Sequence, residues 1–127
     1  MFKSESYRFQ WKDLGDIDEG RPNLGSLVNV AVYRLMQYSV RDVMNRHLSI
    51  EKATELLREA GKLAGTEFCM NALNRSLPFN EFVADLQEKL LALKIGIMRV
   101  EKSDFDKMEF TLTVAEDLDC SGLPAAD

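Results

Sequence analysis

Apolar residues recur every three or four positions through the middle of the chain, and this spacing predicts three amphipathic helices within residues 26–94. The first helix is expected to start at Val30 and to end near His47. Ser49 is a suitable N-cap for the second helix, and Asn80 for the third, because their side chains accept hydrogen bonds from the free N–H groups of a first turn.

Beyond the helices the pattern becomes an alternation of apolar and polar residues, which predicts two strands at residues 95–101 and 109–115. Residues 103–107 suit a hairpin loop between them. An acidic loop that contains Cys120 follows the second strand.

The N-terminal residues carry a weaker version of the strand pattern. Tyr7, Phe9 and Trp11 alternate with polar residues, and glycines and a proline punctuate the sequence that follows. Residues 1–25 are therefore expected to form one short strand and an irregular connector.

These elements predict an α+β fold, with helices packed on one side of a small antiparallel sheet. The 127 residues fit a single domain, in which residues 1–25, 26–94 and 95–127 form the connector, the helices, and the hairpin with its acidic loop. A narrow sheet leaves an unpaired edge, so we expect a homodimer or a continuation of the sheet by further residues.

Composition and charge narrow the classes of partner. The formal net charge of −5 argues against nucleic acid, whose phosphates are bound by clustered lysine and arginine. No stretch approaches the roughly 20 apolar residues of a membrane span, so the expected location is the cytoplasm. Two cysteines are too few for a disulfide framework and fit a reducing compartment.

Three segments carry a family resemblance when taken in order: residues 30–35 (VAVYRL), residues 60–65 (AGKLAG), and the run from residue 94 to residue 122. Together they resemble small prokaryotic proteins with a 4-vinyl reductase-like domain, which are described as predicted hydrocarbon-binding proteins. The resemblance covers the chain from Phe9 onward.

The resemblance implies a hydrophobic small-molecule pocket between helices and sheet, in a dimer. It also implies that this chain is the N-terminal portion of the domain, because family members continue with a cysteine-rich half. In phenol-responsive members those cysteines help to hold zinc, so zinc is expected here only if such a continuation follows Asp127.

Two residues are candidate ligand-binding positions. Phe68 and Met98 are expected to line the pocket, because the end of the second helix and one face of the sheet meet there in the predicted order. Six residues form the wider set of candidate interior positions: Met36, Met44, Phe68, Met70, Met98 and Phe110. A set of this kind is also typical of an ordinary core.

Other candidate chemistry is sparse. Cys120 is a candidate metal ligand that needs partners absent from this chain, and its alternative is an ordinary loop cysteine. Cys69 is expected to pack as a small hydrophobe. His47, the single histidine, suits the last turn of a helix, so no histidine-based triad is available and no catalytic residue is assigned.

Three functions follow from these observations. The leading hypothesis is a module that binds or senses a hydrophobic small molecule, such as an aromatic, isoprenoid or acyl compound. An enzyme, namely a vinyl reductase acting on a tetrapyrrole, is the first alternative, although the sequence holds no Gly-rich dinucleotide loop. The second is a structural adaptor that dimerises through the sheet edge or through the face of Gly61 and Gly65.

Overall fold

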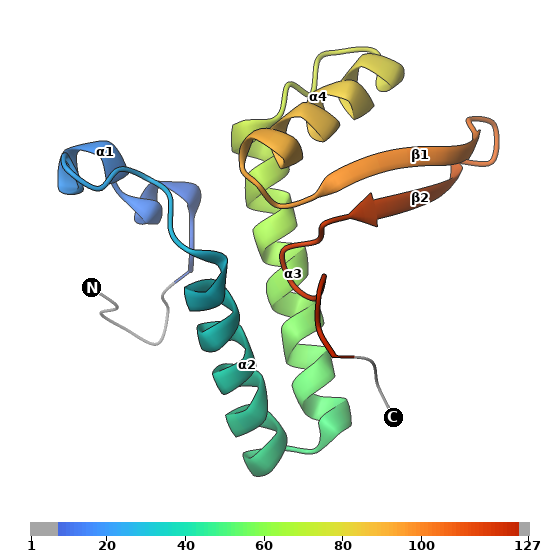
Figure 1. Cartoon of the computed structure of the whole chain (residues 1–127). Coiled ribbons are helices and arrows are strands. Elements are labelled where there is room, and N and C mark those ends of the chain that lie inside the picture. The colour runs from blue at the N-terminus through green and yellow to red at the C-terminus, as the bar shows by residue number, and fades with distance from the viewer. Residues whose placement is uncertain (1–7, 125–127) are drawn as a thin grey trace. The chain divides into compact units, whose positions relative to one another are not determined.

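The computed structural model describes residues 8–124, and the chain divides into two compact units, residues 1–71 and 72–127. The described residues contain four α-helices, one short 3₁₀ helix and a two-stranded antiparallel sheet. This set of helices and antiparallel strands confirms the predicted α+β class (Figure 1). No helix among residues 8–124 is long and apolar enough to span a membrane.

The first unit is helical. Its elements are the 3₁₀ helix Trp11–Leu14, α1 (Ile17–Gly20), α2 (Val30–His47) and α3 (Ile50–Ala72), whose last residue falls in the second unit.

The predicted N-terminal strand is wrong where the structure describes it. Trp11 begins the 3₁₀ helix, and Tyr7 lies outside the described residues. The Gln10 backbone N–H donates to the Asp13 carboxylate at 2.9 Å, so a local polar cap starts a helical turn and overrides the alternation of aromatic residues. The connector is also less irregular than expected, since α1 lies within it.

Side-chain caps mark the starts of the two long helices. The Asn29 side chain accepts a hydrogen bond from the Ala31 N–H at 2.8 Å at the start of α2, and His47 lies in its last turn, as predicted. The predicted cap on the next helix is confirmed, because the Ser49 hydroxyl accepts from the Lys52 N–H at 3.0 Å.

The apolar stripe predicted for α2 does not form a closed core in the described structure. Leu35 and Met36 are 66% and 60% exposed, whereas Ala53 of α3 is fully buried. The 3₁₀ helix is fastened to α3: the Trp11 backbone N–H donates to the Glu67 carboxylate at 3.2 Å, and the Trp11 and Phe68 rings lie 6.4 Å apart.

The second unit begins with a loop and α4 (Phe79–Ala92). Pro78, rather than the predicted Asn80, is the N-cap, and its carbonyl accepts from the Phe82 N–H at 2.8 Å. Proline suits this position because its fixed φ, here −54°, matches an extended cap and its missing N–H costs no helical hydrogen bond. Asn80 lies inside the first turn.

A Schellman motif ends α4. The Ile95 N–H donates to the Leu90 carbonyl at 2.9 Å, and the Lys94 N–H donates to the Leu91 carbonyl at 3.1 Å. Lys94 has a φ of 63°, so a lysine occupies the left-handed position at which glycine is common. The helix therefore turns at Lys94, two residues before Gly96.

The hairpin consists of β1 (Ile97–Asp104) and β2 (Glu109–Ala115). The second strand has its predicted bounds, while β1 starts two residues later and ends three residues later than predicted. The Asp104 carboxylate accepts from the N–H groups of Asp106 and Lys107, both at 3.1 Å, and this contact shortens the loop to four residues. The register shifts between Val100 and Lys102, which leaves a bulge in β1.

Within this unit, α4 packs against the hairpin, as Figure 1 shows for the elements labelled α4, β1 and β2. Met98 of β1 is buried there, with 8% of its surface exposed. The Gln87 side-chain amide donates to the Met98 carbonyl at 3.1 Å and fixes the helix along β1. The helix thereby covers the apolar face that a two-stranded sheet cannot bury alone.

Gly96 permits a close approach at the start of this hairpin. A Cβ at this buried position would lie 2.7 Å from Val114 Cγ1 and 3.5 Å from the Ala115 carbonyl oxygen. A β-branched valine has little freedom to rotate away from such a contact.

The substitution Gly96→Ala is therefore expected to lower the free energy of unfolding by about 1–2 kcal/mol through overpacking. Gly61→Ala is the matched control, because a Cβ at this α3 position meets no atom within 4 Å. We expect it to raise stability by about 0.5–1 kcal/mol, as alanine is the better helix former. Urea unfolding measures both values, and a Gly96→Ala protein as stable as the wild type would contradict the close approach.

Candidate functional site

A half-open cavity of about 310 Å³ lies inside the second unit, between α4 and the hairpin. Nine of its lining residues are apolar, and they come from α4, from both strands and from the turn: Phe79, Phe82, Val83, Leu86, Met98, Val100, Phe105, Phe110 and Leu112. The strand residues are brought to one face by the pairing register, in which Val100 faces Leu112. The cavity is thus a product of helix and sheet periodicities that meet on one side.

The end of the cavity near the hairpin turn is aromatic, because three phenylalanines line it. Phe79 and Phe110 stack with their ring centroids 5.1 Å apart and an interplanar angle of 23°. Phe105 meets both rings edge-on, at 5.6 Å from Phe79 and 6.0 Å from Phe110. Such offset and edge-to-face pairs are favourable aromatic geometries, and they hold the turn against the start of α4.

The polar groups in the lining are few and uncharged. Asn80 of α4 and Ser103 of β1 are the polar residues among those that line the cavity within residues 8–124. Their amide and hydroxyl groups have both donor and acceptor capacity. A site of this composition favours a neutral apolar ligand. The two polar residues could each form a hydrogen bond with a polar group of that ligand.

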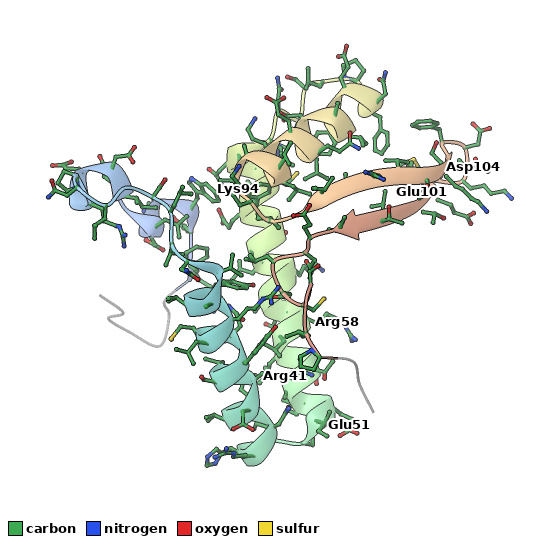
Figure 2. The ribbon with its side chains drawn as sticks, in the orientation of Figure 1. Arg41, Glu51, Arg58, Lys94, Glu101 and Asp104 are labelled. Carbon is green, nitrogen blue, oxygen red and sulfur yellow. The ribbon has the colours of Figure 1, made fainter. Side chains whose placement is uncertain are left out.

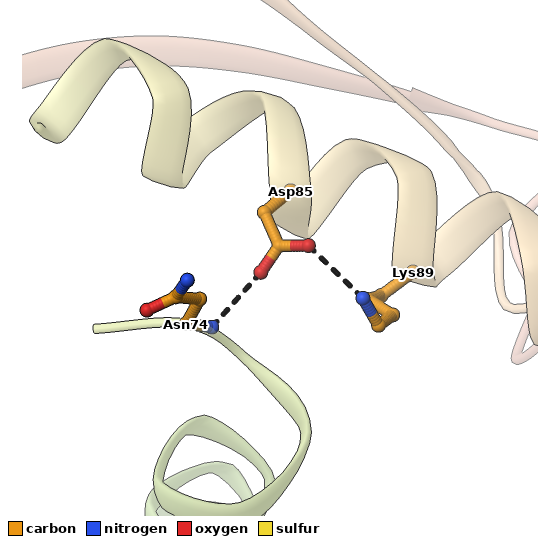
Figure 3. Close-up of polar contacts among 3 residues, drawn as sticks. All are labelled: Asn74, Asp85 and Lys89. Atoms are coloured by element: carbon orange, nitrogen blue, oxygen red, sulfur yellow. Dashed lines mark hydrogen bonds and ion pairs between the residues drawn. The ribbon is translucent and has the colours of Figure 1, made fainter. Parts of the chain in front are cut away.

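Asp85 fixes the segment that leads into α4. Its carboxylate accepts from the Asn74 backbone N–H at 2.9 Å and from the Lys89 ammonium group at 3.0 Å (Figure 3). The hydrogen bond from Asn74, and then that from Lys89, lower the pKa of Asp85 below its ordinary value of 3.8, although partial burial opposes the shift. This contact positions the first turn of the helix, which supplies Phe79 to the cavity.

The two residues predicted to bind ligand lie in different units. Met98 lines the cavity of the second unit. Phe68 belongs to the first unit, where it is half-buried and pairs with Trp11. Of the wider candidate set, Phe110 also lines the cavity, whereas Met36 and Met70 are exposed rather than interior.

Cys120 is exposed in the loop after β2, and its partner is a neighbouring acid. Its thiol and its backbone N–H both donate to the same Asp117 carboxylate oxygen, each at 3.0 Å. Within residues 8–124 no group of three or more histidine, cysteine or acidic side chains is placed to hold a metal ion. Cys69 is half-buried on α3, in keeping with the predicted packing role.

Two residues that line the cavity, Phe79 and Phe105, lie outside the predicted helices and strands. Phe79 precedes the predicted cap, although its spacing continues the apolar stripe of Phe82 and Val83. Phe105 lies in the predicted loop and belongs to no stripe. The usable signal for Phe79 is its helical spacing to Phe82 and Val83, whereas Phe105 joins Phe79 and Phe110 only in the folded unit.

The lowered pKa of Asp85 predicts an acid-sensitive helix start. The carboxylate's contribution to stability is fully present above pH 3.8 and is lost as the pH falls through the lower folded-state pKa. We therefore expect Asp85→Asn to lower stability at neutral pH and to flatten the loss of stability below pH 3.8.

Lys89→Met is the matched control, because it keeps the hydrogen bond from the Asn74 N–H, the largest single cause of the lowered pKa, and removes the hydrogen bond and the charge of Lys89. The carboxyl carbon of Asp85, followed by NMR, should titrate below 3.8 in the wild type and closer to 3.8 in Lys89→Met. Titration of the wild-type group at or above 3.8 would contradict the contact geometry.

Comparison of the chain with protein-family models, with curated proteins and with solved structures finds no match. The resemblance to the 4-vinyl reductase-like domain therefore stays a prediction from sequence.

Proposed function

We propose that this chain is a binding module for a neutral hydrophobic small molecule, held between α4 and the hairpin. The observation that carries the proposal is the apolar cavity of about 310 Å³, with three phenylalanines at one end and two uncharged polar residues in its lining. Burial of apolar ligand surface supplies the driving force, at roughly 25 cal/mol per Å² before the costs of binding.

The cavity volume favours small ligands. An apolar protein cavity of about 150 Å³ accommodates benzene, and the present cavity is about twice as large. It is therefore suited to a bicyclic aromatic compound, or to an isoprenoid or acyl chain of similar volume. A tetrapyrrole has four linked rings and would need about 600 Å³ on the same scale, which supports a binding module over a reductase of tetrapyrroles.

Naphthalene is a suitable first probe, because it is neutral, bicyclic and without hydrogen-bonding groups. We expect saturable binding with a dissociation constant on the order of 10–1000 µM and a rise in the melting temperature of the protein. Isothermal titration calorimetry and thermal unfolding measure these two effects. Absence of binding by naphthalene and by 1-decanol at their solubility limits would contradict the proposal.

The substitution Val83→Trp places an indole ring in the cavity from the side of α4. We expect it to weaken naphthalene binding by at least about tenfold, because the ring occupies the ligand volume. Val43→Trp is the matched control, since Val43 is an exposed residue of α2 in the other unit. Equal loss of binding in both variants, or loss in neither, would place the ligand elsewhere.

A further inference from the structure

The two strands of the sheet differ in how well they are protected against pairing with another strand. The β1 strand contains a bulge at Glu101 and carries Arg99, Lys102 and Asp104, so charged side chains and a break in the ladder lie along it (Figure 2 labels Glu101 and Asp104). Bulges and charged residues are the usual devices that prevent edge-to-edge association. The β1 strand is also the one that contacts α4.

The β2 strand has fewer of these devices. It contains no proline and no basic residue, its register is regular opposite Ile97 to Val100, and its single charged residue, Glu109, stands at its first position. Within residues 8–124 the sheet has two strands, so β2 pairs with β1 on one edge and with no strand on the other. Leu112 and Val114 are 49% and 50% exposed on this strand.

The sequence of β2 is also complementary to itself. Residues 110–114 read Phe-Thr-Leu-Thr-Val, which has the same order of apolar residues and threonines in both directions from Leu112. If two copies pair antiparallel about Leu112, each Phe110 faces Val114 of the second copy, and each Thr111 faces its Thr113. Glu109 then faces an alanine, so no like charges oppose each other.

We propose that the free edge of β2 binds the β2 strand of a second copy of this chain, so that the two hairpins form one four-stranded antiparallel sheet. The axis that relates two antiparallel copies in one sheet is perpendicular to the sheet, so both apolar faces lie on the same side. Phe110 and Leu112, which line the cavity, belong to this strand. The two cavities therefore share one continuous sheet as their floor.

This pairing also corrects a weakness of the isolated hairpin. Two-stranded sheets are marginal in water and are stabilised by further strands or by packing against a helix. The helix α4 already covers one face of this hairpin, and strand addition supplies the further strands. Strand addition satisfies the N–H and carbonyl groups of the free edge in both copies at once. Because the interface is the same segment on each side, the association closes as a dimer.

A charge-swap pair tests both the edge and its register. Thr111 and Thr113 face Lys102 and Arg99 within the hairpin, and the Thr113 hydroxyl also donates to the Glu101 carboxylate at 2.9 Å. A glutamate at 111 therefore finds an opposite charge in its own chain, while one at 113 lies beside both Arg99 and Glu101. In the proposed dimer the same glutamates oppose each other across the axis. The double variant Thr111→Glu/Thr113→Glu is therefore expected to keep its fold and to raise the dimer dissociation constant at least about tenfold.

The matched variant Thr111→Glu/Thr113→Lys alters the same two positions but sets each glutamate opposite a lysine of the second copy. Its dimer dissociation constant is expected to stay within about threefold of that of the wild type. Sedimentation equilibrium measures both values, with circular dichroism as the check on folding. A wild-type chain that sediments at its own mass of 14.4 kDa at high micromolar concentration, or equal dissociation constants for the two variants, overturns the proposal.

A cross-link provides a readout that does not depend on charge. In a Cys69→Ser/Cys120→Ser background, Leu112→Cys places two thiols opposite each other at the axis, whereas Leu91→Cys is an exposed control on α4. Under mild oxidation the first variant is expected to form a disulfide-linked dimer and the second to stay monomeric. Failure of Leu112→Cys to cross-link faster than Leu91→Cys overturns the proposed register.

Discussion

The packing of α4 across one face of the hairpin is the interaction on which the second unit depends. A two-stranded sheet leaves one face exposed and is marginal in water, so β1 and β2 need a cover. The helix supplies it with Phe82, Val83 and Leu86, and the Gln87 side chain ties it to the Met98 carbonyl. The cavity exists because this cover meets the sheet without filling all the space between them.

The two ends of α4 are fixed by different means, and both affect the cavity. At the start, Pro78 caps the helix and the Asp85 carboxylate holds the preceding loop, which sets the position of Phe79. At the end, the Schellman motif at Lys94 reverses the chain, and Gly96 lets it pass close to Val114. The helix is thereby held over the strands by its termini as well as by its apolar face.

The sequence predicts the elements well where one signal dominates. The 3.6-residue periodicity defines α2, the Ser49 cap defines the start of α3, and the alternation of threonine with apolar residues defines β2. Prediction fails where a local contact determines the secondary structure. The hydrogen bond between Gln10 and Asp13 starts a 3₁₀ helix where a strand was predicted.

The candidate site is only partly predictable, for a physical reason. Periodicity identifies which residues share a face, and two of the candidate interior positions, Met98 and Phe110, line the cavity. Periodicity does not identify which faces meet. Phe68 lies on an equally apolar stripe but belongs to a different unit. Phe79 fits the helical spacing of α4 but precedes the predicted cap, and Phe105 lies in a turn without periodicity. The two rings come together only through tertiary packing.

The central claim is that the space between α4 and the hairpin admits a small apolar molecule. Methionine methyl NMR during a naphthalene titration tests it most directly, because Met98 lines the cavity and Met70 is an exposed residue of α3. The account predicts that the Met98 methyl signal shifts and saturates while the Met70 signal stays unchanged. An unperturbed Met98 signal, or equal shifts at both methionines, would contradict it.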